Sequence, residues 1–328
     1  MIIKRQLFKK HSRDIKIILL LFLATLCVMS FYTFWGLTEK NIGYYLPRRS
    51  LKMLAIIVVS YCVGYSTVTF QTITGNRILT PSIIGLDSLY LFIQTVIVFS
   101  FGSKQLSMMT GYPNFILSIV FMIGSSCLLF YFLFRGENKN LYFLVLAGMI
   151  VGTLFRGMST FMQVLLDPNE FSVLQGKMFA TFNNINQDLL GISLLLIIII
   201  IIITLKDLKE YDVIELGADH AINLGISYNK AVLKSLIITS ILISVSTALV
   251  GPITFLGILV VSLSRRIVKS YHHSLQIIAA VLIGCLSLSV GTLIVEKVFQ
   301  FSIPISVIIN FFGGICFIYL LLKESKKW

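Results

Sequence analysis

The chain has 328 residues, of which 57% are hydrophobic and 12% are charged, and its mean hydropathy is +0.92. A soluble domain has roughly 45–50% apolar and about 25% charged residues, and single hydrophobic cores stop growing near about 250–300 residues. The composition therefore excludes a soluble globular protein. The formal net charge of +13 does not indicate nucleic-acid binding, because the basic residues lie between apolar runs and act as topology signals.

Runs of about 17–25 apolar residues predict the membrane-spanning helices. Ten such runs occur, at residues 15–36, 51–72, 82–102, 112–134, 141–166, 187–205, 229–250, 253–268, 274–296 and 304–323. The sequence thus predicts an all-α integral membrane protein with about ten transmembrane helices in a single domain over residues 1–328. The run 253–268 is short, and only Gly251-Pro252 separates it from its predecessor, so this pair departs most from the pattern.

Charge placement predicts the orientation in the membrane. A basic leader, residues 1–14, precedes the first span, and no signal-peptide cleavage pattern follows it. With the amino terminus placed inside, most Lys and Arg residues outside the spans fall on the cytoplasmic side, so both termini are expected there. Two connections are longer than a turn: residues 167–186 on the outer side, which suit a short surface helix, and the acidic cytoplasmic loop 206–228.

The cytoplasmic loop contains a short segment with helical spacing between two glycines. Leu216, Ala221 and Leu224 recur at near-helical intervals, and Gly217 and Gly225 are suited to end the helix. Such an apolar stripe serves either contact with another protein or packing on the chain's own membrane domain, and the pattern leaves both open. No GxxxxGK[ST] phosphate loop occurs in the sequence, so the energy source is another chain or an ion gradient.

The fifth run places small and polar residues on one face of a helix. They recur at i, i+3, i+7, i+10 and i+14 and are Met149, Gly152, Arg156, Ser159 and Gln163. Because a membrane-embedded arginine is costly unless it faces protein or water, we predict that this face lines a translocation path, with Asn310 of the last run as a further candidate. The alternative is that Arg156 pairs within the bundle, for example with Glu296.

The sequence predicts no catalytic site and no metal site. The five cysteines lie inside apolar runs without a metal-ligand spacing, and His220, His272 and His273 are expected at the cytoplasmic surface without a chemical role. A polytopic membrane enzyme would need a polar catalytic cluster, and none has the required spacing. An ion-coupled secondary transporter would need carboxylates within its spans, for which Glu296 is the candidate.

Several short motifs occur in one order along the chain. Leu46-Pro47-Arg48-Arg49 precedes Gln71, and Asn76, Pro81 and Gly85 follow. This series resembles the pattern RxPR…Q…NPLAxPxxLG of the iron-siderophore and cobalamin permeases, the ten-helix membrane subunits of type II ABC importers. Further elements of that family follow in the same order: Leu146-Ala147-Gly148, the segment from Leu216 to Gly225, Gly251-Pro252 with Gly257, Ile303-Pro304, and Phe312-Gly313-Gly314. The resemblance covers nearly the whole chain.

The chain departs from the family pattern at three places. Val261-Ser262 stands where the family commonly has Pro-His, Asn76-Arg77 where it has Asn-Pro, and Lys177 to Thr181 where it has WxxGS. These departures are similar to those of a branch in which a diverged permease pairs with a second, more typical permease chain. A heterodimer is therefore predicted over a homodimer.

The resemblance implies a permease that imports a ferric siderophore, such as a catecholate, through the bacterial cytoplasmic membrane. Cobalamin and haem are the alternative substrates in the same fold. ATP and Mg would be bound by two copies of a partner ATP-binding subunit and no cofactor by this chain, whose loop from Leu216 to Gly225 would dock on that subunit. Arg48, with Arg49 beside it, would dock an extracytoplasmic substrate-binding protein. The fifth and tenth helices would flank the path between two permeases.

Overall fold

The computed structural model describes residues 2–108, 111–134 and 141–325, and all regular secondary structure in these residues is helical. The elements in chain order are α1 (Ile2–Phe34), α2 (Ile42–Thr74), η1 (Pro81–Ile84), α3 (Leu86–Met108), α4 (Tyr112–Phe134), α5 (Leu141–Val164), α6 (Pro168–Met178), α7 (Gln187–Thr204), α8 (Leu208–Ile214), α9 (Ala218–Asn223), α10 (Tyr228–Val250), α11 (Leu256–Ile267), α12 (His273–Lys297) and α13 (Ile305–Ser325).

Each of the ten expected spans corresponds to a helix, which confirms the predicted all-α membrane architecture. Within the described residues, eight helices are long and apolar enough to cross a membrane, and the apolar part of α3, Leu86–Gly102, is shorter. The helix that corresponds to the expected span 253–268, α11, has 12 residues and is about 18 Å long, which is too short for a hydrocarbon layer of about 30 Å. The expected span 253–268 is therefore a half-length helix.

Two other boundaries differ from the expectation. Helix α2 begins at Ile42 and includes Pro47, so the motif before residue 51 is helical. Pro47 lies beyond the first turn, where proline removes one backbone hydrogen bond of the helix. The basic leader continues without a break into the first span as part of α1. The short helix expected in 167–186 is confirmed as α6.

Helices α2, α10 and α12 form the middle of the bundle, and small residues bring α2 and α12 together. A Cβ on Gly284 would lie 3.0 Å from the Cβ of Ser60, and a Cβ on Gly64 would lie 3.3 Å from the backbone nitrogen of Val281. Lipid provides no hydrophobic drive between apolar helices, so close contact through small residues holds such bundles together. The α2–α12 pair is accordingly buried along most of its length.

A second close crossing joins η1 and α3 to α5. A Cβ on Gly85 would lie 2.7 Å from the Cα of Gly152, and a Cβ on Gly148 would lie 2.9 Å from the Cα of Ile84. Gly85 also has a positive φ of 93°, which glycine adopts readily. Gly148 and Gly152 form a GxxxG pair, the spacing that lets membrane helices approach closely. The family glycine at position 85 is thus required twice, for its conformation and for space.

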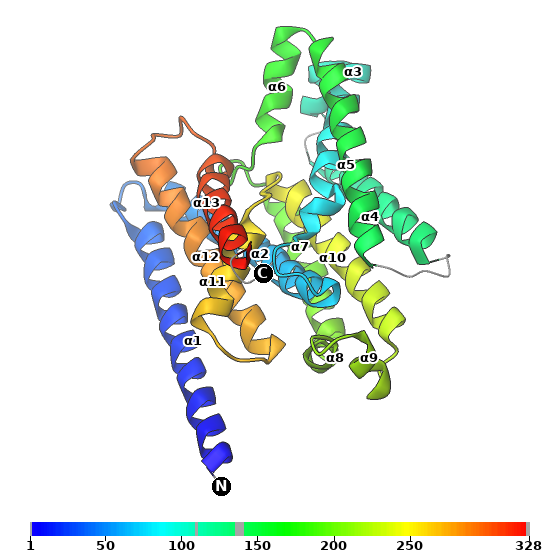
Figure 1. The fold of residues 1–328 in the computed structure, drawn as a ribbon. Helices are drawn as coiled ribbons and strands as arrows, with labels where there is room; N and C mark the ends of the chain where they lie inside the picture. Colours follow the sequence, from blue (N-terminus) through cyan, green and yellow to red (C-terminus); the bar gives the residue numbers. More distant parts are fainter. Residues whose placement is uncertain (1, 109–110, 135–140, 326–328) are drawn as a thin grey trace.

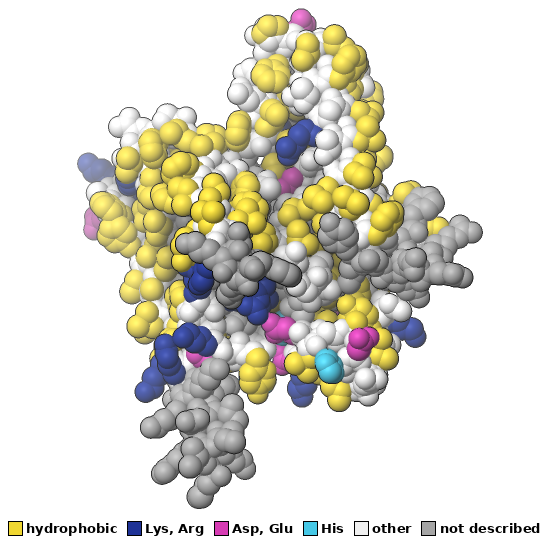
Figure 2. All heavy atoms as spheres, viewed as in Figure 1, with side chains coloured by type: hydrophobic (Ala, Val, Ile, Leu, Met, Phe, Trp, Pro, Cys, Tyr) yellow, Lys and Arg dark blue, Asp and Glu magenta, His cyan; other side chains and the backbone are white. Residues whose placement is uncertain are grey.

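Figure 1 shows the arrangement of the helices. Helix α1 lies along one edge of the bundle, α6 stands at one end, and α8 and α9 lie at the opposite end with the amino terminus. We call these the α6 end and the α8–α9 end. Hydrophobic side chains cover much of the face seen in Figure 2, as expected for helices that face lipid or another chain.

Candidate functional site

Helix α8 is fixed to the membrane helices by polar contacts along its whole length. Tyr211 is 2% exposed; its hydroxyl accepts a 2.9 Å hydrogen bond from Ser235 of α10 and lies 3.4 Å from the hydroxyl of Tyr65 in α2. Before and after it, Asp207 pairs with Lys234 at 2.6 Å and Glu215 pairs with Arg265 at 3.2 Å. The seven-residue helix α8 is therefore bound to α2, α10 and α11.

Asp212 fastens α8 to the start of α12. Its Oδ1 accepts 2.7 Å hydrogen bonds from the backbone N–H and from Nδ1 of His273, and its Oδ2 lies 3.2 Å from Nδ1 of His272. The other ring nitrogen of His273 lies 2.7 Å from the hydroxyl of Thr72. The expectation that His273 is a surface residue is wrong, since it is 2% exposed. Its burial is possible because Asp212 and Thr72 give both ring nitrogens a hydrogen-bond partner.

The Asp212 clamp predicts a pH-dependent stability. Burial alone would raise the pKa of this carboxyl, but its hydrogen bonds with His273 and His272 outweigh burial and hold the pKa below its ordinary 3.8. A carboxyl with a lowered folded-state pKa stabilises the fold above its unfolded pKa, and this contribution is lost as the pH falls through the folded value. We expect Asp212→Asn to lower the unfolding temperature at pH 7, and the difference from the wild type to shrink below about pH 4.

The measurement is thermal unfolding of the purified chain in detergent at a series of pH values, with Asp219→Asn as control, because Asp219 lies exposed on α9. A difference between wild type and Asp212→Asn that stays constant down to pH 3 would contradict the assigned role.

Helix α9 answers the question that the sequence left open. Ala221 is completely buried against the rest of the chain, whereas Leu216 and Leu224 are 62% and 66% exposed. Ile222, which the sequence interpretation missed, is 57% exposed. The segment thus packs on its own chain through Ala221 and presents an apolar surface through Leu216, Ile222 and Leu224, which we call the coupling surface. The predicted stripe of Leu216, Ala221 and Leu224 is therefore not one surface, because Ala221 faces the chain's own helices and the two leucines face away from them.

The two glycines beside α9 have conformational roles. Gly217 has a φ of 109° and Gly225 a φ of 86°, and no atom lies within 4 Å of a Cβ added at either position. The left-handed conformation, and not lack of space, therefore requires glycine there.

The two arginines near the start of α2 have different environments. Arg49 donates hydrogen bonds to the carbonyl oxygens of Tyr32, Thr33 and Trp35 at 3.3, 3.2 and 2.6 Å, so it caps the carboxyl end of α1. Arg48 is exposed, its guanidinium lies 4.1 Å from the ring centre of Tyr44, and it hydrogen-bonds the Tyr44 hydroxyl. Arg48 is therefore the better placed of the two to meet another protein.

This difference predicts two separable phenotypes. Arg49→Ala should destabilise the chain by about 1–2 kcal/mol, because three carbonyl groups lose a charged donor. Arg48→Ala should leave the unfolding temperature within about a degree of the wild type, since exposed substitutions change stability little, and should weaken the binding of an extracytoplasmic binding protein. Thermal unfolding and surface plasmon resonance check the two results; loss of stability in Arg48→Ala with full binding would reverse the assignment.

The residues predicted to line a path on α5 divide into two groups. Gly152 and Ser159 are buried against α3; the Ser159 hydroxyl lies 2.7 Å from that of Thr95, and Gln163 donates to Ser159 at 2.8 Å. Met149 and Arg156 are exposed, so they are the members of this face that can meet a solute or another chain. Lining of a path stays a prediction.

The alternative pairing of Arg156 with Glu296 is wrong. Glu296 forms an ion pair with Lys52 and accepts a 2.6 Å hydrogen bond from the Tyr32 hydroxyl. These contacts join α1, α2 and α12 near the α6 end. Asn310, the other path candidate, is half-buried, and its Oδ1 accepts a 3.4 Å hydrogen bond from the backbone N–H of Phe255, which supports the start of α11.

The remaining family positions are packing and turn residues. The side chain of Asn76 accepts a 2.9 Å hydrogen bond from the N–H of Ile78, Pro81 begins η1, and Gln71 is buried in α2. A Cβ on Gly257 would collide with the side chain of Thr67. Gly313 and Gly314 differ: a Cβ on Gly313 would lie 2.6 Å from the Cβ of Phe255, whereas one on Gly314 meets nothing within 4 Å.

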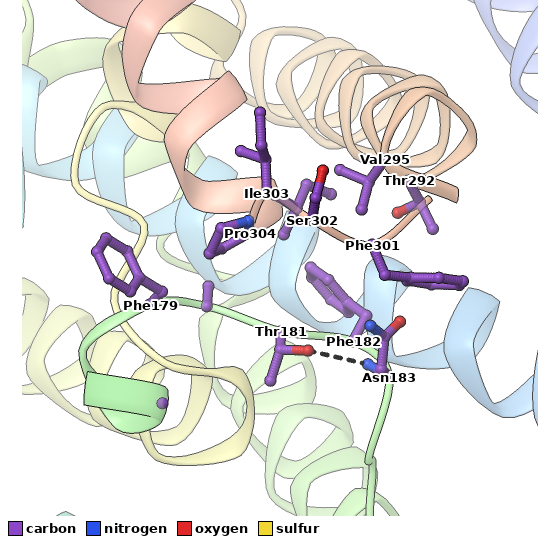
Figure 3. A pocket seen from close by; sticks show the side chains of 13 residues that line it. Phe179, Thr181, Phe182, Asn183, Thr292, Val295, Phe301, Ser302, Ile303 and Pro304 are labelled. Atoms are coloured by element: carbon purple, nitrogen blue, oxygen red, sulfur yellow. Dashed lines mark hydrogen bonds between the residues drawn. The ribbon is translucent and has the colours of Figure 1, made fainter. Parts of the chain in front are cut away.

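A cavity of about 230 Å³ lies where the segment after α6 crosses the ends of α12 and α13 (Figure 3). Pro304 and Phe301 line it from one side and Thr181 and Phe182 from the other. The backbone N–H of Thr181 donates to the carbonyl oxygen of Val250 at 2.8 Å. The segment that replaces WxxGS is therefore bound to the break between α10 and α11. A Cβ added at Gly251, in this break, would lie 3.0 Å from the Cα of Ala180.

Asp87 is a buried acid that the sequence interpretation overlooked. It lies in the first turn of α3, inside the expected span 82–102, and is 6% exposed. The hydroxyl of Thr254 donates to its Oδ2 at 3.2 Å. Glu296 is therefore not the one carboxylate within the expected spans, because Asp87 lies within 82–102, two residues after the family glycine Gly85.

Comparison with known proteins gives a consistent result. The sequence pattern of the FecCD transport family matches residues 15–323. The chain is 52% identical to the petrobactin import system permease protein YclO of Bacillus subtilis, over 96% of this chain and 99% of YclO. It is 36% identical to FatC of Bacillus anthracis, over 96% and 91% of the two chains, and 25% identical to YclN of Bacillus subtilis, over 89% and 90%; both are also named petrobactin import system permease proteins.

A solved structure shows the same fold. A chain of a metal-chelate-type ABC transporter in an inward-facing conformation matches with a TM-score of 0.80 at 22% identity, over 94% of this chain and 99% of that chain.

Proposed function

Because the chain belongs to the FecCD transport family, we propose that it is the membrane-spanning subunit of a bacterial ABC importer for a ferric siderophore of the petrobactin kind. The observation that carries this proposal is the 52% identity to a petrobactin permease across 96% of this chain and 99% of that relative. A second relative at 36% identity has the same named substrate. A chain of membrane helices whose sequence has no phosphate-binding loop suits a transport subunit that a separate ATPase drives.

The proposed orientation places the α8–α9 end in the cytoplasm and the α6 end outside. The Lys and Arg distribution supports it through the positive-inside rule. In this orientation the coupling surface faces one of the two copies of a partner ATP-binding subunit, which hold ATP and Mg, and Arg48 faces an extracytoplasmic binding protein. An apolar helix surface fits a groove on a partner.

The proposed assembly contains a second permease chain of a different sequence. Bacillus subtilis has two permease proteins named for petrobactin import, and this chain is 52% identical to one and 25% to the other. Helices α5 and α13 also expose large apolar side chains, which include Phe161 at 69% and Phe311 at 64%. Such side chains suit contact with lipid or with a second membrane chain.

The test is uptake of radioactive iron in cells deleted for this chain and complemented with the wild type. Ferric petrobactin, a ferric hydroxamate and haem are supplied separately, and labelled cobalamin is measured in parallel. We expect restored uptake of ferric petrobactin, and no uptake when the Walker lysine of the partner ATPase is replaced. Unchanged iron uptake in the deletion strain with every chelate would overturn the siderophore proposal, and uptake that survives the ATPase variant would overturn ATP coupling.

A further inference from the structure

A second cavity, of about 550 Å³, lies at the end of α6 from which the chain continues to α7 (Figure 1). Its lining comes from α3, α4, α6, α7 and α10 and from the segment between α6 and α7. Helices α4, α7 and α10 are long and apolar enough to cross a membrane, and they contribute only residues of their first or last two turns. The cavity is therefore at one boundary of the hydrocarbon layer, where lipid headgroups lie.

Lys177 supplies the charge of this cavity. It is the one charged side chain among the described lining residues, it is half-buried, and it forms no ion pair or hydrogen bond with the described part of the chain. Burial lowers the pKa of its ammonium group, and no described acid offsets this effect. A lysine that is only half-buried, with an ordinary pKa of 10.5, nevertheless keeps its proton at pH 7. The cavity thus has a positive charge without a negative partner.

The polar groups that stay unused in the lining are mainly hydrogen-bond donors. The Oδ1 atom of Asn114 accepts from Gln94 at 2.9 Å and from Ser118 at 3.1 Å, and that of Asn186 accepts from two backbone N–H groups at the start of α7. Both oxygens are occupied, whereas each amide NH2 retains a free N–H in the described chain. The Tyr90 hydroxyl also has no partner there, although Tyr90 is only 5% exposed. Free donors beside a lysine suit an anion with several acceptor oxygens.

The remainder of the lining is apolar and continues between membrane helices. Phe115 of α4 and Leu189 of α7 line the cavity and pack with Val245 of α10 in a small cluster separate from the main core. On the same helices, Ile116 and Leu195 are 54% and 59% exposed, as expected for contact with lipid tails. A small inorganic anion, only a few times larger than a water molecule of about 30 Å³, would leave most of the cavity empty. A ligand with a charged head and apolar chains fits both parts.

We propose that this cavity binds the phosphate group of an anionic phospholipid, with Lys177 as the charged contact and the Tyr90 hydroxyl as a hydrogen-bond donor. Basic pockets between membrane helices recognise lipid headgroups in this way. The bound headgroup joins the segment after α6 to α3 and α4. The site gives a role to Lys177, where the segment that replaces WxxGS begins. It does not depend on which substrate the importer carries.

The test uses the full chain, purified in detergent and freed of lipid. Phosphatidylglycerol is added, and its binding is followed by native mass spectrometry and by the rise in unfolding temperature. We expect Lys177→Gln to raise the Kd about tenfold or more, because a charge-assisted hydrogen bond is lost, and Lys177→Arg to keep a Kd near that of the wild type. Tyr90→Phe should raise the Kd about threefold. Lys40→Gln removes an exposed lysine between α1 and α2 and is the matched control.

Two further ligands separate the sources of the phosphate group. Phosphatidylcholine has the same phosphodiester without a net charge and should bind at least about tenfold more weakly than phosphatidylglycerol. Inorganic phosphate should not raise the unfolding temperature at concentrations at which phosphatidylglycerol does. Equal effects of inorganic phosphate and phosphatidylglycerol would overturn the assignment to a lipid. Displacement of the bound lipid by ferric petrobactin would overturn it too, because the cavity would then belong to the transport path.

The variants also show whether binding is specific to this cavity. An unchanged Kd in Lys177→Gln would overturn the proposal, and so would a rise in Lys40→Gln as large as that in Lys177→Gln, which would indicate general attraction to a basic surface. If Lys177→Gln fails to accumulate, Tyr90→Phe still tests the site, because it removes one hydroxyl and retains the ring. An unchanged Kd in Tyr90→Phe together with full binding of phosphatidylcholine would then contradict the proposal.

Discussion

Replacing both Leu216 and Leu224 with Glu should abolish uptake while leaving the chain folded. These side chains are 62% and 66% exposed, so the substitutions should change the stability of the chain by only about 0.5 kcal/mol. In the proposed complex with the ATPase, both leucines become buried and each contributes about 1.5–3 kcal/mol. Two unpaired carboxylates in that contact cost several kcal/mol more, so we expect the affinity to fall by more than about a thousandfold.

The measurement combines uptake in cells with co-purification of the ATPase subunit on the tagged permease. Lys209→Glu is the matched control: it also adds negative charge at an exposed position of the same loop, on α8, and lies outside the coupling surface. Normal uptake in the double variant would show that the coupling surface faces something other than the ATPase. Loss of the permease from the membrane in the double variant would instead point to a packing role.

Gly313→Ala should destabilise the chain strongly, whereas Gly314→Ala should not. A Cβ at position 313 would lie 2.6 Å from the Cβ and 3.0 Å from the carbonyl oxygen of Phe255. Phe255 precedes α11 and donates its N–H to Asn310, so α13 and the start of α11 would have to separate. Overpacking of this kind costs about 1–3 kcal/mol. Position 314 has open space, and alanine there favours the helix.

Thermal unfolding of the purified single chain, compared at equal detergent concentration, checks this pair. The two glycines are neighbours in one motif, so differences in expression or helix propensity are matched. Equal unfolding temperatures for the two variants would contradict the close contact between α13 and Phe255. A transport defect of Gly314→Ala without lower stability would place that residue at the contact with the second permease.

The sequence predicts most of the fold because hydrophobic length alone marks a membrane helix. It does not predict that α11 is half-length, because the apolar run continues through Ile253 and Phe255 while the backbone turns at Gly251. Likewise the family pattern marks Gly85 as special, but only the opposing Gly152 explains the need for close approach.

The candidate site was predicted less completely, because burial depends on partners that are distant in sequence. Arg48 and Arg49 look equivalent in sequence, yet Arg49 donates its hydrogen bonds to the carbonyl groups at the end of α1. His273 is buried because Asp212 and Thr72 meet it from α8 and α2. Asp87 accepts a hydrogen bond from Thr254, which lies 167 residues further along the chain, and no local spacing reveals this contact.

The packing of α1 has a consequence for the order of assembly during synthesis. Only 11% of its apolar window is buried, and its main neighbour is α12, which is made near the end of translation. For most of that time the nascent first helix has lipid on nearly every side, and its exposed apolar side chains suit that environment. Arg49 becomes available as soon as α2 is made and holds the end of α1 in place. We therefore expect α1 to be attached at one end through Arg49 before α12, its main neighbour, is synthesised and packs against it.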